Sequence, residues 1–122
     1  NRRVIPAYPG IIISIQRTLL LDAINRVKLV LSDKSSGIEL VFHENTLTLK
    51  AKSVEENAEE VLDIEYDGVE NHIGFNYSYL MDTLRVMQSE NVLLKFTDMQ
   101  SSVLIEGVEQ QDGSHVVMPV RL

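Results

Sequence analysis

Three histidines and eighteen carboxylates are the side chains of this 122-residue chain that could support acid-base chemistry or bind a metal ion. A helical zinc site would need a second histidine four residues after His43, but Leu47 occupies that position, and His43 ends a predicted strand. His72 and His115 stand alone at the starts of predicted strands. Because the chain has no cysteine, thiolate metal sites and thiol nucleophiles are excluded. We expect surface histidines, no metal and no cofactor.

Motifs typical of catalysis are also missing from the sequence. It contains no Gly-rich loop that would cradle a phosphate, no serine nucleophile elbow and no Asp-x-Asp pair. The sequence therefore predicts a binding protein and not an enzyme.

Length and hydropathy predict one globular domain, because 122 residues with 44% hydrophobic content are enough to form a core. The longest apolar-rich stretch, PGIIISIQ at 9–16, is far shorter than the ~20 residues that span a bilayer. Together with the lack of cysteine, this predicts a cytoplasmic protein. Since the chain begins at Asn1 and not at Met, we expect a piece of something longer.

Negative charge is concentrated in one segment. Residues 53–70, SVEENAEEVLDIEYDGVE, contain eight carboxylates and neither Lys nor Arg. The whole chain has a net charge of −7, so this run of −8 leaves +1 for the remainder. The distribution predicts one acidic face on an otherwise balanced body.

Hydrophobic spacing predicts two helices, at 18–31 with Thr18 as the cap and at 76–89 behind Asn76. Short β-branched runs elsewhere predict strands, and the turn pairs Glu44-Asn45, Asp67-Gly68 and Asp112-Gly113 are typical of antiparallel hairpins. Each half opens with a strand, the second of them near Ile73. The other predicted strands are 37–43, 46–52 and 60–66 in the first half and 91–97, 102–106 and 115–121 in the second.

The resulting order, strand, helix and three strands, occurs twice. The halves also match in sequence, since IELVFHE at 38–44 aligns with VLLKFTD at 92–98. We predict an α+β fold made of two strand-helix-three-strand repeats, 9–67 and 68–122, with antiparallel sheets outside and both helices on one side.

The last eight residues, HVVMPVRL, are unusually apolar for a chain end. Pro119 cannot donate a hydrogen bond to a β-ladder, so this segment is not expected to be a central strand throughout. Alternate side chains at 116–118 are expected to fill the core. Beyond Pro119, we expect Val120 and Leu122 at the surface, where apolar residues mark a binding site.

Four of these segments together resemble a known family. RRVIP at 2–6, IGFNYSYLMDTL at 73–84, SSVLIE at 101–106 and VVMPVRL at 116–122 are similar to the third and last domain of the bacterial DNA sliding clamp, the beta subunit of the replicative polymerase. The resemblance covers essentially the whole chain. It implies the DNA clamp fold, with residues 1–8 ending the middle domain and 9–122 forming the third domain.

The resemblance also implies a function. Two three-domain subunits of such a clamp close into a ring around duplex DNA, with helices lining the hole. Arg26, Lys28 and Arg85 would then face DNA, although Asp22 and Arg26 are also spaced as an ordinary helix pair. We expect weak, salt-sensitive contacts in the ring and no measurable duplex affinity for this domain alone.

Two protein-binding surfaces are implied as well. Replicative and repair polymerases and the clamp loader would insert a glutamine-led peptide into a pocket formed by Arg3, Val4, Asn76, Tyr79, Ser102, Val116, Val117, Met118, Pro119, Val120, Arg121 and Leu122. The homodimer interface of the full-length protein would use Val30, Leu31, Glu55, Glu56, Glu59 and Glu60, and this chain alone would be monomeric.

Two positions depart from the family pattern, because Gln100 replaces an apolar pocket residue and Val120 often corresponds to Met. The alternative interpretation is a generic β-rich protein-binding domain without a DNA role. Ring-type oligomerisation of the full-length protein, or its absence, would separate the two.

Overall fold

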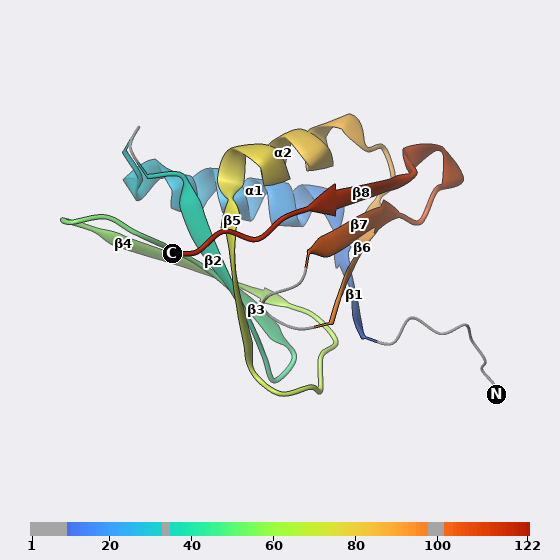
Figure 1. The fold of residues 1–122 in the computed structure, drawn as a ribbon, viewed down its shortest axis with the longest axis horizontal. Coiled ribbons are helices and arrows are strands. Elements are labelled where there is room, and N and C mark those ends of the chain that lie inside the picture. The colour runs from blue at the N-terminus through green and yellow to red at the C-terminus, as the bar shows by residue number, and fades with distance from the viewer. Residues whose placement is uncertain (1–9, 33–34, 98–101) are drawn as a thin grey trace.

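Strand, helix and three strands follow one another twice along the chain, as the sequence predicts (Figure 1). The computed structural model describes residues 10–32, 35–97 and 102–122. The first half comprises β1 (Ile11–Gln16), α1 (Arg17–Val27), the short 3-10 helix η1 (Lys28–Val30), β2 (Gly37–His43), β3 (Thr46–Lys52) and β4 (Asn57–Asp63). The second comprises β5 (Asn71–Asn76), α2 (Tyr77–Val86), β6 (Asn91–Phe96), β7 (Val103–Gly107), the 3-10 helix η2 (Gln110–Asp112) and β8 (Ser114–Val117).

The two halves exchange their first strands. One antiparallel sheet has the order β1-β6-β7-β8 and the other β4-β3-β2-β5, so β1 pairs with strands of the second half and β5 with strands of the first. The same hydrogen bond occurs at both exchanged strands. Arg17 N–H, at the start of α1, donates to the Glu90 carbonyl just before β6, and Tyr77 N–H, at the start of α2, donates to the Ser36 carbonyl just before β2. Each helix thus begins beside the strand that its own half supplies to the opposite sheet.

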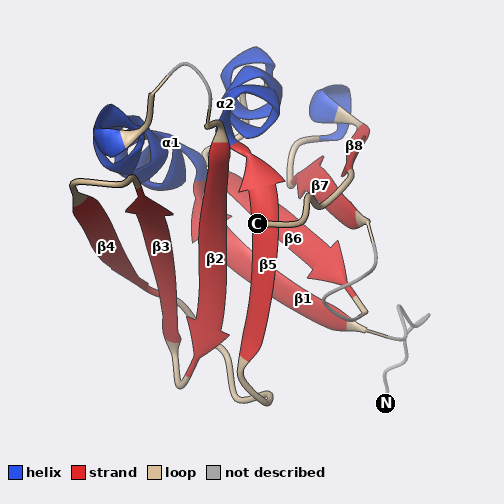
Figure 2. Cartoon of the chain, turned by 60° about the vertical axis from the view of Figure 1, so that its left-hand side comes forward, coloured by secondary structure: helices blue, strands red, loops and turns tan. Residues whose placement is uncertain are grey.

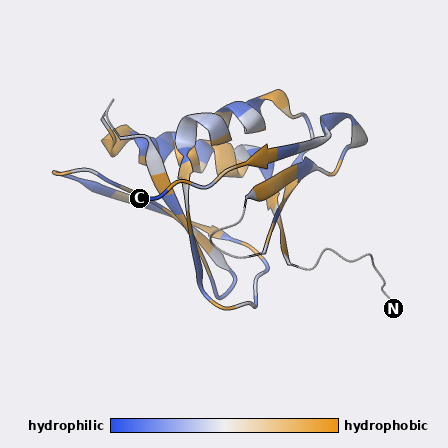
Figure 3. Ribbon diagram, viewed as in Figure 1, coloured by the Kyte–Doolittle hydropathy of each residue, from blue (hydrophilic) through white to orange (hydrophobic). Residues whose placement is uncertain are grey.

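One core of buried side chains lies between the sheets and the helices. Figure 3 shows how hydrophobic and hydrophilic residues are distributed along the ribbon. In β3, Leu47, Leu49 and Ala51 are buried while the residues between them are more exposed. Across the core, the Phe42 ring of β2 lies 4.9 Å from the Phe96 ring of β6, centroid to centroid. Contact between strands of different sheets makes the core continuous.

Both helices lie on the same side of the sheets and contact each other (Figure 2). The buried residues of α1 are Leu20, Ala23, Ile24 and Val27, and those of α2 are Leu80, Met81 and Leu84. Most of these residues are three or four positions apart, so they share one side of each helix, as the hydrophobic spacing predicts. No helix in the described part of the chain has the length and apolarity needed to cross a membrane.

The predicted cap and end of the first helix are wrong. The helix begins at Arg17, so Thr18 lies inside its first turn, and the cap residue Gln16 makes no side-chain hydrogen bond to it. The α-helix ends at Val27 and continues as η1, which leaves Leu31 extended. The cap predicted for the second helix is confirmed: Asn76 Oδ1 accepts hydrogen bonds from the N–H groups of Ser78, at 2.8 Å, and Tyr79, at 3.3 Å.

The last strand of the first half, β4, lies three residues earlier than predicted, at 57–63 and not 60–66. Ser53 sets this register, because its N–H donates to the Glu56 carbonyl and its Oγ accepts from Glu56 N–H, which turns the chain directly back along β3. Ile64 and Tyr66 remain buried beyond the strand, where their N–H groups bond to Asn45, and this buried alternation explains the misplaced prediction.

One of the three predicted hairpins is wrong. Glu44 and Asn45 join β2 to β3 with positive φ angles of 45° and 62°, as a two-residue hairpin requires. Gly113, with φ of 64°, precedes β8, which pairs with β7. However, Asp67-Gly68 connects β4 to β5, and these two strands lie at opposite edges of their sheet.

We predict that Asn76→Ala lowers the free energy of unfolding by about 1 kcal/mol, because two N–H groups of α2 lose their acceptor. Gln16→Ala is the matched control at the cap of α1 and should change it by less than about 0.5 kcal/mol. Urea unfolding followed by circular dichroism measures both. Equal losses would contradict the assignment of Asn76 as a cap.

Candidate functional site

The final segment of the chain leaves one sheet and attaches to the other. The strand predicted at 115–121 ends at Val117, just before the proline. Val120 N–H then donates to the Gly74 carbonyl of β5 at 2.8 Å. Because β5 is an edge strand, this bond uses a carbonyl that the sheet leaves open. The segment Met118–Leu122, here called the tail, therefore bridges the two sheets (Figures 1 and 2).

The tail is largely exposed where it crosses the outer face of the β4-β3-β2-β5 sheet. Relative exposure is 66% for Met118, 40% for Val120 and 67% for Leu122. Val116 is 65% exposed, whereas Val117 is buried in the core. The expected alternation at 116–118 is confirmed: the Val117 side chain faces inward, and its two neighbours face solvent. The surface near the chain end therefore includes four exposed apolar side chains, those of Val116, Met118, Val120 and Leu122.

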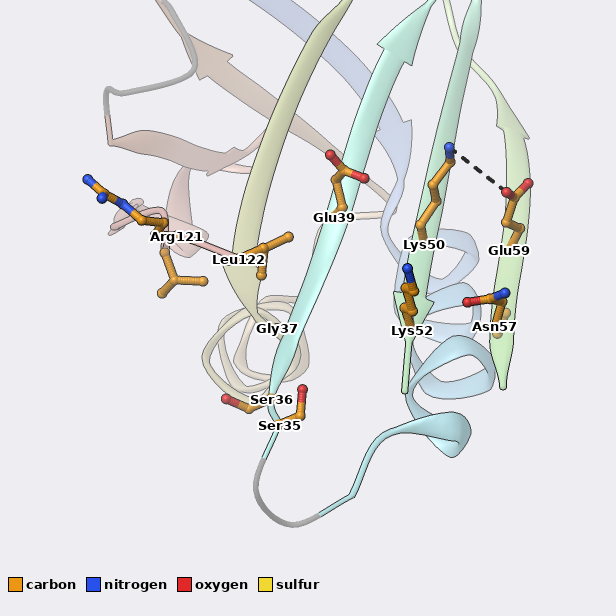
Figure 4. Close-up of a pocket in the computed structure, with 13 residues that line it drawn as sticks. Ser35, Ser36, Gly37, Glu39, Lys50, Lys52, Asn57, Glu59, Arg121 and Leu122 are labelled. Carbon is orange, nitrogen blue, oxygen red and sulfur yellow. Dashed lines mark ion pairs between the residues drawn. The ribbon is translucent and has the colours of Figure 1, made fainter. Parts of the chain in front are cut away.

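Two hollows lie beside the tail. One, of about 740 Å³, extends from Val120–Leu122 across β2 and β3 to β4 and includes Glu39, Lys50 and Lys52 (Figure 4). The other, of about 480 Å³, is lined by Glu39, His72 and Gly74 together with the tail. Neither Gly74 nor His72 was among the predicted site residues. Glycines inside strand patterns, Gly37 and Gly74, were the only sequence signal that something approaches this face.

The remaining predicted pocket residues are only partly brought together. Asn76 follows Gly74 by two residues on the same face of β5, but its Oδ1 is already used as the helix cap. Tyr79, in the first turn of α2, is 68% exposed and available to a ligand. Ser102 is half-buried just before β7. Arg3, Val4 and Gln100 lie outside the described residues.

His72 does not stand alone, in contrast to the sequence interpretation. Its Nδ1 lies 2.9 Å from Glu39 Oε2 and its Nε2 lies 2.5 Å from Glu70 Oε2. Glu70, and to a smaller degree Glu39, raises the pKa of His72, and the bond from His72 lowers the pKa of Glu70. His43 Nδ1 also approaches Glu70, at 3.3 Å. Among the described residues, no group of three or more side chains is arranged to hold a metal ion.

The cations predicted to face DNA all lie on the helical side. Arg26 of α1 bonds Glu60 of β4 at 2.8 Å, which raises the pKa of Arg26 and lowers that of Glu60. The ordinary helix pair with Asp22 is thus replaced by a contact with the sheet. Lys28 lies over the Tyr77 ring, 5.8 Å from its centroid. Arg85 lies 3.9 Å from Asp82.

The residues predicted at the dimer interface surround an exposed sheet edge. β4 ends its sheet, and its N-terminal turn exposes Glu55 and Glu56. The other two predicted carboxylates have partners within the chain, Glu60 with Arg26 and Glu59 with Lys50, the latter at 3.9 Å.

Apolar residues adjoin this edge. Val30 and Leu31, which the sequence suggested, are partly buried and pack against the core. Leu29, Val54 and Val61 are more exposed, at 76%, 103% and 60%. Val61 is exposed because it faces away from the core, next to the buried Leu62 in β4.

Comparison with known proteins gives consistent matches over the whole chain. A family model described as the DNA polymerase III beta subunit, C-terminal domain, matches residues 2–121. The beta sliding clamp of Escherichia coli strain K12 is 42% identical over 122 residues, which are 99% of this chain and 33% of the relative. That of Pseudomonas putida KT2440 is 38% identical over 98% of this chain and 33% of the relative.

A solved structure agrees with these sequence matches. The crystal structure of the DNA polymerase III subunit beta from Pseudomonas aeruginosa superposes with a TM-score of 0.87 at 35% identity, over 97% of this chain and 32% of that one. The chain therefore spans about a third of the length of the relatives that it matches.

The His72 cluster predicts a defined pH response. Because folding raises the His72 pKa above 6.5, its stabilising contribution is complete below pH 6.5 and is lost as the pH rises through the folded pKa. The lowered pKa of Glu70 gives a contribution that is present above pH 4.5 and is lost as the pH falls through its folded pKa. Both contributions operate together between these values.

Glu70→Gln should therefore lower the pKa of His72 measured by NMR titration of its ring protons, and Glu39→Gln should lower it less. Glu65→Gln is the control, because Glu65 is exposed and is not among the groups that shift His72. An unchanged His72 pKa in Glu70→Gln would contradict the cluster.

Proposed function

The chain belongs to the beta sliding clamp family, and we propose that it serves as the third domain of a ring-shaped, non-catalytic processivity factor of a bacterial DNA polymerase. The observation that carries this proposal is the match to the C-terminal domain model over residues 2–121, together with a two-layer architecture that superposes on a clamp at a TM-score of 0.87. Residues 1–8 would end the middle domain. We place the protein in the cytoplasm.

The arrangement of layers supports an encircling role. Both helices lie on one side, where they would line the hole, and the sheets lie on the other (Figure 2). Arg26, Lys28 and Arg85 lie on the helical side, but Arg26 and Arg85 have carboxylate partners and Lys28 contacts a ring. Such partly neutralised cations favour weak contact with phosphates. The hold on duplex DNA would then come from ring closure and not from direct affinity.

The open edge of β4 supports closure of the ring by a second subunit. An unpaired edge strand offers a row of backbone donors and acceptors to another chain. Leu29, Val54 and Val61 supply exposed apolar area beside it, and the exposed side chains of Glu55 and Glu56 supply negative charge. Negative charge at this edge would select a basic partner surface and set its orientation.

The tail and its surroundings support binding of short peptides from polymerases and the clamp loader. Exposed Met118 and Leu122 offer adaptable apolar contacts, Tyr79 offers a flat face with a hydroxyl, and Arg121 can donate to peptide carbonyls. These residues come from separate elements that the fold places around β5. The middle domain, with Arg3 and Val4, would complete the pocket.

We expect a glutamine-led peptide that ends in Leu and an aromatic residue to bind the full-length clamp with a roughly micromolar dissociation constant. Met118→Ala and removal of Arg121 and Leu122 should each weaken binding about tenfold, because exposed apolar contacts are lost. Val69→Ala, an exposed valine in the β4–β5 loop, should have no effect. Isothermal titration measures all four. Unchanged affinity in both tail variants would remove the tail from the site.

We also expect Glu55, Glu56, Glu59 and Glu60, all changed to Lys in the full-length protein, to abolish the dimer by reversing the charge of the β4 edge. Sedimentation velocity should then show monomers. Part of the effect at Glu60 comes through Arg26, so the pair Glu55→Lys and Glu56→Lys is the cleaner variant.

A matched control for dimerisation changes four exposed carboxylates away from this edge by the same total charge. These are Glu44, Glu65, Asp67 and Glu90. The control should remain dimeric. A retained dimer in the edge variants would contradict the proposed interface.

A further inference from the structure

Two strands of the β4-β3-β2-β5 sheet contain a glycine where the backbone does not need one. Gly37 opens β2, and Gly74 lies within β5. Among the described glycines only Gly113 has a positive φ, so left-handed backbone conformation explains neither of these two. Glycine weakens a strand, because it has no side chain to pack and loses more conformational freedom on folding. The remaining reason for such a glycine is that another part of the molecule approaches closely.

The tail is what approaches. A Cβ atom added at Gly74 would lie 2.6 Å from Leu122 Cγ and 2.7 Å from the Val120 carbonyl oxygen, closer than real Cβ atoms come to other heavy atoms. A Cβ atom added at Gly37 would overlap Leu122 Cδ2, while the next atoms are 3.8 Å and 4.0 Å away. At both glycines, the tail therefore occupies the space that a Cβ atom would need.

Both glycines lie under the same residue of the tail, Leu122. Gly37 pairs with Asn76 and Gly74 pairs with Glu39, so they lie on adjacent strands with their missing side chains on the same outer face. Leu122 lies over both glycines, and Figure 4 shows it next to Gly37. The hydrogen bond from Val120 N–H to the Gly74 carbonyl, at 2.8 Å, holds the backbone at the edge of β5 while Leu122 covers the face.

We propose that Gly37 and Gly74 form a seat that positions the tail, and that they thereby set the affinity of the peptide site without touching the peptide. The second part rests on the proposed function. Leu122 remains 67% exposed in the seat, so little buried area holds it and a single methyl group is enough to displace it. Gly37 and Gly74 are positioning residues in this sense.

The geometry ranks the two substitutions. In Gly74→Ala the new methyl meets a backbone oxygen, which moves only with the tail, so the bond from Val120 must break. In Gly37→Ala it meets the end of a flexible side chain, which can rotate away. Gly74→Ala should therefore displace the tail more than Gly37→Ala does.

The test uses the full-length protein with Gly74→Ala, Gly37→Ala, Leu122→Ala and the double variant Gly37→Ala/Leu122→Ala. Hydrogen exchange of residues 118–122, followed by mass spectrometry, reports the tail, and titration with the glutamine-led peptide reports the site. Exchange within β3 reports whether the sheet stays folded, which it should, because alanine suits a strand better than glycine does.

We expect Gly74→Ala to raise the exchange rate of the tail and to lower the affinity for the peptide. Each change should be about three- to tenfold, the range for one lost hydrogen bond. Gly37→Ala should have a smaller effect. In the Leu122→Ala background it should add nothing further, because the colliding atoms are gone.

Unchanged tail exchange in Gly74→Ala would overturn the seat, and so would an undiminished effect of Gly37→Ala in the Leu122→Ala background. Faster tail exchange with unchanged peptide affinity would overturn the positioning role. If the unaltered protein fails to bind the peptide, the proposed function fails, and the exchange data still decide whether the seat exists.

Discussion

Neither four-stranded sheet can form from one half of the chain, because one edge strand of each sheet, β1 or β5, comes from the other half. β1 is separated by more than seventy residues from β6, its partner, and β5 pairs back onto β2. These long-range pairings commit the whole chain to one core, in which Phe42 meets Phe96. The helices, which lie next to the exchanged strands, are brought into contact by the same constraint. The sheets, the helical layer and the tail attachment all depend on it.

Polar contacts reinforce the junctions that the exchange creates. Arg17, the first residue of α1, donates from Nε to the Ser89 carbonyl at 2.8 Å and from a terminal nitrogen to the Leu84 carbonyl at 3.0 Å. Asp112 accepts from the N–H groups of Gln88 and Ser89. Its pKa is lowered mainly by the side chain of Ser89, and these two backbone bonds lower it further. The end of α2 is therefore fixed by side chains from both ends of the chain.

Charge is distributed in accord with this architecture. The acidic run follows the β3–β4 turn, the open edge and the loop before β5, so most of it lies at the periphery of one sheet. Within the acidic run, Glu60 forms an ion pair with Arg26 of α1. Glu70 of the run and Glu39 of β2 both contact His72. Glu55 and Glu56 lie in the exposed turn before β4, next to the exposed Val54. The β4 edge therefore carries both negative charge and exposed apolar side chains.

The sequence alone determined the order of the elements, the apolar stripes of both helices, the Asn76 cap, the Glu44-Asn45 turn and the outward direction of the residues around Pro119. These features are local: each depends on side chains within a few positions of one another. The family could also be identified from short motifs. Tertiary structure decided which strands pair, where β4 begins and ends, and that Glu60 and not Asp22 binds Arg26. It also decided that the tail rests on Gly37 and Gly74. Those outcomes depend on partners far apart in the chain, and an alternating pattern shows which face of a strand is buried but not which neighbour it pairs with.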